Sequence, residues 1–192
     1  MLSMNAIIAF EFGLGLLAVV LGWIFAFDPL QTIARGPAAL LGNLRQMALG
    51  AALAVPLLAF FLALERFVQS WQSQIREVLF EHLIPLMDEV GWAGRAVVSL
   101  GAGVGEELLF RGLIQHGAHQ AWGAVPALLL ASVLFGAAHY VNRVYFVAAT
   151  FMGVVFGLLL IWTGSLLTPI TTHAVYDFLA LEQLVRQFRA PA

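Results

Sequence analysis

Residues 95–114 read RAVVSLGAGVGEELLFRGLI, a mainly apolar stretch that contains Glu106, Glu107 and Arg111. A helix of about 20 predominantly apolar residues can cross a bilayer. An ionisable side chain at the centre of such a helix costs roughly 2.5–3.5 kcal/mol on insertion. Three in one stretch therefore predict that this helix faces protein or a water-filled cavity on at least one side.

The composition of the rest of the chain indicates a membrane protein. Of its 192 residues, 61% are hydrophobic and only 10% are charged, and the mean hydropathy is +0.92. In soluble domains about a quarter of the residues are charged. We therefore predict an all-α fold, a polytopic transmembrane helix bundle of about six spans. The expected spans lie near residues 7–27, 46–64, 96–115, 124–140, 144–162 and 166–184.

Residues 68–84 have a different pattern. Apolar side chains recur there at helical spacing, and polar side chains fill the opposite face. This pattern predicts an amphipathic helix that lies in the membrane interface. The same helix could pack on protein, and the sequence does not separate the two alternatives.

The arginines predict the topology, since all nine basic residues are Arg. If the spans alternate, two arginines, Arg35 and Arg45, fall on one side of the membrane. The other side receives Arg66, Arg76, Arg95, Arg143, Arg186 and Arg189. The positive-inside rule then predicts a multi-pass protein of the cell membrane with both termini in the cytoplasm.

Charge and glycine content divide the chain near residue 95. We expect residues 1–94 to form two spans and the amphipathic connector, residues 95–185 a four-helix core, and residues 186–192 a cytoplasmic tail. The net charge of −2 provides no basic field for nucleic acid. The absence of cysteine excludes disulfides, thiolate catalysis and Cys-based zinc sites.

Adjacent glutamates in the third span have different surroundings. Glu107 and Arg111 are i,i+4 neighbours, and an internal ion pair is the expected arrangement. Glu106 points about 100° away from Glu107 around the helix. It therefore has no local partner and needs another role. Glu11, early in the first span, is expected to reach the interface.

Two later spans add imidazoles. His139 ends the fourth span, four residues after Phe135, and by itself would be an interfacial histidine. His173 and Asp177 share a helix face in the last span, where a local hydrogen bond between helices and a functional site are equally good explanations. Together with Glu106, the two imidazoles could activate a water, either directly or through a metal.

Glycines precede the glutamate pair. Gly101, Gly103 and Gly105 would allow neighbouring helices to approach closely, which could bring the other spans near Glu106. Gly153 and Gly157 form a similar pattern that indicates helix packing alone.

Three motifs resemble those of one known family. They are Glu106-Glu107-Leu-Leu-Phe-Arg111, Phe135-Gly-Ala-Ala-His139 and His173-Ala-Val-Tyr-Asp177. They are similar to the EExxxR, FxxxH and HxxxN/D motifs of the CPBP intramembrane proteases, also called the Abi or CAAX prenyl protease family. The resemblance covers roughly residues 95–185 and implies an all-helical membrane endopeptidase.

The resemblance also implies roles. Glu106 would activate the water with help from His139, and His173 and Asp177 would position or stabilise the oxyanion. Glu107, Arg111 and Phe135 would support the site. Many family members have Asn at the position of Asp177, and only a protonated Asp could donate a hydrogen bond as Asn does. The catalytic type, metallo or glutamate, stays open: Glu106, His139 and His173 could also hold a metal, with zinc as the candidate.

Two other functional classes compete with a protease. Intramembrane Glu, Arg and His also mark ion- or proton-coupled transporters, although no inverted repeat is visible. A non-catalytic membrane adaptor could keep the same residues as a polar core. The expected partners of a protease are membrane lipid and a peptide or protein substrate, and no cofactor other than the candidate zinc is implied.

Overall fold

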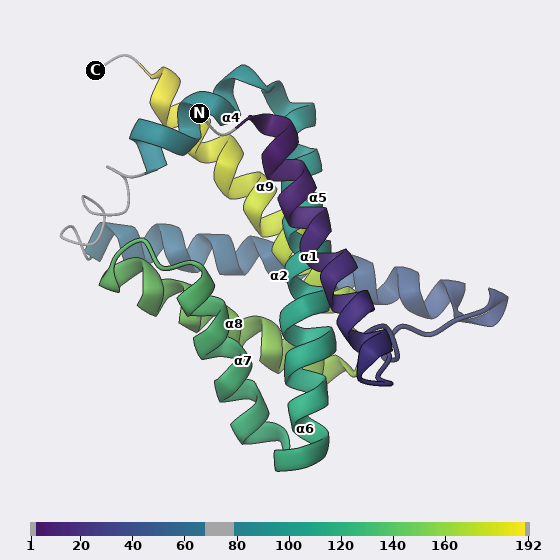
Figure 1. Cartoon of the computed structure of the whole chain (residues 1–192). Coiled ribbons are helices and arrows are strands. Elements are labelled where there is room, and N and C mark those ends of the chain that lie inside the picture. Colours follow the sequence, from purple (N-terminus) through teal and green to yellow (C-terminus); the bar gives the residue numbers. More distant parts are fainter. Residues whose placement is uncertain (1–2, 68–78, 191–192) are drawn as a thin grey trace.

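The computed structural model describes residues 3–67 and 79–190, and this part of the chain contains helices and no strand (Figure 1). All six predicted windows are helical, which confirms the all-α fold. The long helices are α1 (Met4–Ile24), α2 (Leu40–Phe67), α5 (Gly91–Glu107), α7 (Ala124–Ala138), α8 (Arg143–Thr163) and α9 (Leu167–Arg189). Shorter elements are η1 (Pro37–Ala39), η2 (Leu79–Leu83), α4 (Ile84–Glu89), η3 (Leu108–Gln115) and α6 (His116–Trp122).

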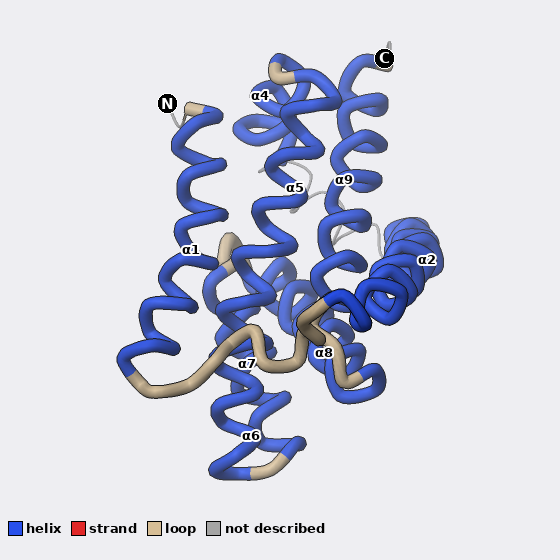
Figure 2. The backbone as a smooth tube through the Cα atoms, turned by 90° about the vertical axis from the view of Figure 1, so that its right-hand side faces the viewer, coloured by secondary structure: helices blue, strands red, loops and turns tan. Residues whose placement is uncertain are grey.

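Helices α1, α5 and α9 lie side by side, and α1 begins at the same end of the molecule at which α9 ends (Figures 1 and 2). Helix α2 packs on the outer side of α9 and runs across it, so that Figure 2 shows α2 end-on. Helices α7 and α8 form an antiparallel pair that packs on η3 and on α9. Their connecting turn lies part-way along α5 and α9 (Figure 1).

Three helical segments are long and apolar enough to cross a membrane by themselves, within the described residues: Met4–Ile24, Pro37–Leu64 and Arg143–Thr163. Helix α7 is apolar but shorter, at 15 residues. Helices α5 and α9 each carry several charged residues, which lowers their apolar character. The chain is thus a helical membrane protein in which the polar helices lie at the centre.

Residues at the helix ends explain where the helices begin and end. The Asn142 side chain accepts a hydrogen bond from the Tyr145 N–H and caps α8, and Gly164 ends that helix in the left-handed conformation, with φ of 66°. Pro126 and Pro169 occupy the first turns of α7 and α9, where a missing N–H costs least.

The predicted amphipathic helix falls mostly outside the described residues, which resume at residue 79. There a π-helical turn, η2, leads into α4. Arg95 on α5 fixes α4 in place: its Nη1 donates to the Met87 carbonyl at 2.7 Å, and its Nε donates to Glu182 on α9 at 2.6 Å. Arg95, which the arginine count assigns to the cytoplasmic side, is buried, and these two partners replace water.

Candidate active site

Three faces of helix α5 have different neighbours, and these neighbours determine the surroundings of its glutamates. A Cβ on Gly105 would overlap the carbonyl oxygen of Glu11, so this face lies against α1. A Cβ on Gly103 would lie 2.8 Å from Ala174, so its face lies against α9. Residues one position apart differ by about 100° around a helix. Glu106 lies between the two contact faces and lines a cavity instead.

The first imidazole beside Glu106 is that of His139, at the C-terminal end of α7. Its Oε1 lies 3.5 Å from His139 Nε2, whereas its Oε2 is buried without a hydrogen-bond partner. His139 Nδ1 lies 2.9 Å from the Phe135 carbonyl oxygen, which can only accept. The proton of Nδ1 is therefore directed to that carbonyl, and Nε2 faces Glu106 and the cavity.

His173 of α9 lies between the two glutamates. Its Nδ1 donates to Glu107 Oε1 at 2.9 Å, and its Nε2 lies 3.9 Å from Glu106 Oε2. Asp177, one turn further along α9, places Oδ2 3.3 Å from the same Nε2. The predicted local contact between His173 and Asp177 is present, and it is part of a larger cluster.

The expected ion pair between Glu107 and Arg111 is also present. Arg111 Nη1 lies 3.2 Å from Glu107 Oε1, and both side chains are fully buried. Arg111 Nη2 donates to the Gly153 carbonyl on α8 at 3.0 Å. Gly153, interpreted from sequence as a packing residue, therefore also supplies an acceptor; a Cβ on it would lie 2.9 Å from Ser132 of α7.

Phe135 and Phe156 hold the charged groups in position. The Phe135 ring lies 4.4 Å from the His139 ring centroid and 4.4 Å below the guanidinium carbon of Arg111. Phe156 on α8 stacks on His173 at 4.7 Å. The sequence indicated Phe135 but not Phe156, because nothing distinguishes Phe156 from the other apolar residues of its span.

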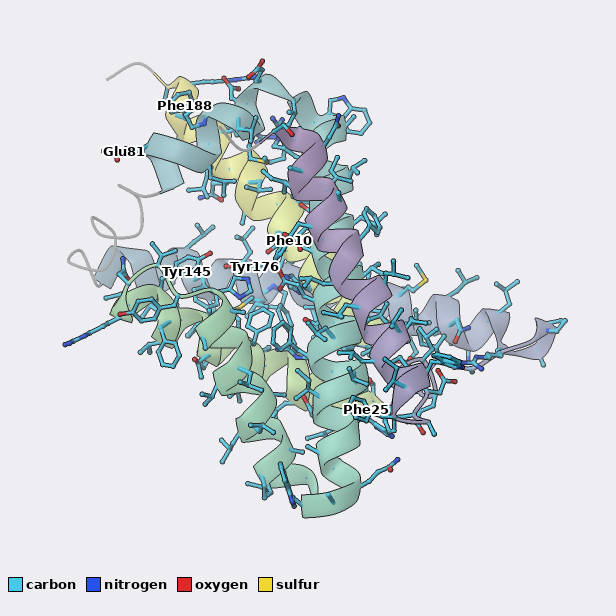
Figure 3. The ribbon with its side chains drawn as sticks, viewed as in Figure 1. Phe10, Phe25, Glu81, Tyr145, Tyr176 and Phe188 are labelled. Carbon is cyan, nitrogen blue, oxygen red and sulfur yellow. The ribbon has the colours of Figure 1, made fainter. Side chains whose placement is uncertain are left out.

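The cavity has a volume of about 520 Å³ and mostly apolar walls. All four predicted catalytic residues line it: Glu106, His139, His173 and Asp177. Tyr145 and Tyr176, labelled in Figure 3, line it as well. The structure thus brings together side chains from α5, α7 and α9 that are far apart in the sequence.

Glu11 is a functional candidate that the sequence did not assign to the site. It was expected to reach the interface, but it lines the same cavity, and its Oε2 is buried without a hydrogen-bond partner. The cause is the close contact of α1 with α5 at Gly101 and Gly105, which directs this part of α1 inward. The sequence signal that could have indicated Glu11 is an isolated acidic residue within an apolar span.

Comparison with known proteins places this arrangement in a family. Residues 88–179 match the family model described as type II CAAX prenyl endopeptidase Rce1-like. This segment is therefore similar to the Rce1-like family. The match confirms the predicted CAAX protease relationship and supports a peptidase. The matched segment begins before the predicted domain boundary at residue 95 and ends before the predicted boundary at residue 185. The division of the chain into three parts stays a prediction. No curated protein and no solved structure matched the chain.

A metal centre was the alternative use of these side chains. Among the described residues, no group of three or more His, Asp and Glu side chains is arranged to hold a metal ion. The Nδ1 atom of each imidazole is directed to Phe135 or Glu107, and the Nε2 atom of each faces Glu106. Metal analysis of the purified protein is the test for zinc.

Proposed function

We propose that this protein is an intramembrane endopeptidase in which Glu106 activates a water for attack on a peptide bond. The observation that carries the proposal is the convergence of Glu106, His139 and His173 from three helices in one cavity of a peptidase-family segment. Glu106 supports this role because it lines the cavity and one of its carboxylate oxygens makes no hydrogen bond.

The proposed reaction begins with a water in the cavity that contacts both Glu106 and His139. Their facing atoms are 3.5 Å apart, so a single water molecule can contact both. Glu106 accepts a proton as the water oxygen bonds to the carbonyl carbon of the substrate. The carbon–nitrogen bond then breaks, and the leaving nitrogen takes that proton.

His173 is placed to stabilise the negative charge that develops on the carbonyl oxygen. In its protonated form it would donate to Glu107 from Nδ1 and toward the cavity from Nε2. Asp177 would then orient His173 rather than act on the oxyanion directly. Glu107, supported by Arg111, holds the Nδ1 side of the His173 ring in place. Neither residue takes part in proton transfer.

Peptide cleavage by the purified protein tests the proposal. Wild type, Glu106→Gln and Glu89→Gln are reconstituted in lipid nanodiscs, and products of a mixed peptide library are identified by mass spectrometry. Glu89 is exposed on α4, so its variant controls for the lost charge. We expect Glu106→Gln to lose at least about 10²-fold in rate with unchanged melting temperature, as is typical for general base removal.

The same assay separates the competing classes. Full cleavage by Glu106→Gln would contradict the assigned role, and the absence of any cleavage by wild type would contradict the endopeptidase. Metal content and the effect of a chelator are measured on the same samples. These two measurements decide between a metallo and a glutamate type.

We propose further that the site opens to the cytoplasm of a cell-membrane protein with both termini on that side. The arginine distribution supports this topology. Membrane lipid and a membrane-associated peptide or protein are the partners that follow from it.

A further inference from the structure

Glu11 belongs to α1, which lies outside the segment that matches the family. Its backbone is held against α5, because a Cβ on Gly105 would overlap the Glu11 carbonyl oxygen and a Cβ on Gly101 would lie 3.1 Å from Glu11 Cβ. These close contacts between backbones leave α1 little freedom to rotate or withdraw. The carboxylate of Glu11 is thus held at the cavity wall.

One oxygen of the acidic side chain has no hydrogen-bond partner there. Glu11 Oε2 is buried and makes no hydrogen bond, and the same holds for Oε2 of Glu106, a residue that is only 5% exposed. A buried carboxylate oxygen without a donor is costly. The two residues line the same cavity, and each has one carboxylate oxygen without a donor.

The charges around the cavity do not balance. Its described lining contains three carboxylates, those of Glu11, Glu106 and Asp177, and two imidazoles, those of His139 and His173, but no Arg or Lys. When all five groups are ionised, three negative charges face two positive ones, so one negative charge remains. The Glu107–Arg111 pair is neutral in itself and does not alter this count.

We propose that Glu11 determines substrate specificity by binding a lysine or arginine side chain of the peptide near the scissile bond. This inference rests on the proposed function. A cationic side chain would supply both the missing charge and the missing donors. Its methylene stem can lie along the apolar walls while its charged end reaches the carboxylate. An acidic substrate side chain at the same place would be repelled by the three carboxylates.

Cleavage-site profiling of wild type, Glu11→Gln, Glu11→Asp and Glu89→Gln tests the proposal. Each protein in nanodiscs is given the same peptide library, and the frequency of Lys and Arg within three residues of every cleaved bond is compared with that in uncleaved sequences. We expect wild type, Glu11→Asp and Glu89→Gln to favour basic residues. Glu11→Gln should lose about tenfold of this preference, since a neutral amide cannot replace a buried ion-pair partner. It should still cleave neutral sites.

Peptide pairs provide a measurement that needs no variant. Two peptides that differ only by lysine or norleucine beside the cleaved bond are compared on wild type, and the lysine peptide should have the higher kcat/KM.

Three outcomes would overturn the role of Glu11: equal profiles for wild type and Glu11→Gln, equal loss of all cleavage in Glu11→Gln, or no difference within the peptide pair. If wild type cleaves nothing, the proposed function itself fails.

Discussion

Removal of Arg111 should destabilise the protein more than any change to its surface charges. Arg111 and Glu107 are fully buried, so Arg111→Met leaves the Glu107 carboxylate without its arginine partner. The loss of one partner of a buried ion pair costs about 3–5 kcal/mol. The substitution also removes the hydrogen bond to the Gly153 carbonyl and the contact of the guanidinium with the Phe135 ring. His173 retains Glu107 as its Nδ1 acceptor. The substitution should therefore lower the stability of the fold more than it changes the position of the imidazole.

The melting temperature in nanodiscs measures this effect. In chains of 150–250 residues 1 kcal/mol shifts the melting temperature by about 2–4 °C, so Arg111→Met should lower it by about 6–20 °C. The exposed pair Asp28–Arg35 is the matched control, since its side chains are 43% and 65% exposed. Asp28→Asn and Arg35→Met should each cost about 0–1 kcal/mol. Equal melting temperatures for Arg111→Met and Arg35→Met would refute the reasoning.

A double-mutant cycle sharpens the test. Glu107→Gln combined with Arg111→Met removes both charges, so the pair should be less destabilised than the sum of the two single variants. Additive losses would show that the two side chains do not interact in the folded protein.

Two further predictions concern helix packing and access to the site. Gly105→Ala should lower the melting temperature strongly, because its Cβ would overlap the Glu11 carbonyl, whereas Gly13→Ala should have little effect because nothing lies within 4 Å of its Cβ; similar melting curves would argue against the close contact. A cysteine placed at Tyr140 or Arg143, both exposed, should react with an impermeant thiol reagent only in inside-out vesicles, and labelling from the outer face would reverse the proposed topology.

Patterns within single helices were predictable from the sequence. The Glu107–Arg111 pair and the His173–Asp177 contact follow from i,i+4 spacing, since side chains four residues apart share one face of a helix. The partnerless direction of Glu106 follows from the 100° rotation per residue. The apolar windows predicted all six long helices because lipid selects apolar side chains over a fixed length.

Contacts between helices were not predictable in the same way. The sequence motifs indicated Glu106, His139 and His173, but only the packing of α5, α7 and α9 placed their side chains together. Backbone acceptors are also invisible to a motif, since the Gly153 carbonyl bonds Arg111 through an atom that every residue has.

The sequence by itself determined that the chain forms membrane helices and which of them carry charge, because insertion energies and helical periodicity depend on local composition. The tertiary structure alone decided that α2 lies across α9 and that Glu11 lines the cavity (Figure 2). Both depend on where small residues allow two backbones to approach. That choice is a property of paired surfaces that are distant in the chain, and no single segment encodes it.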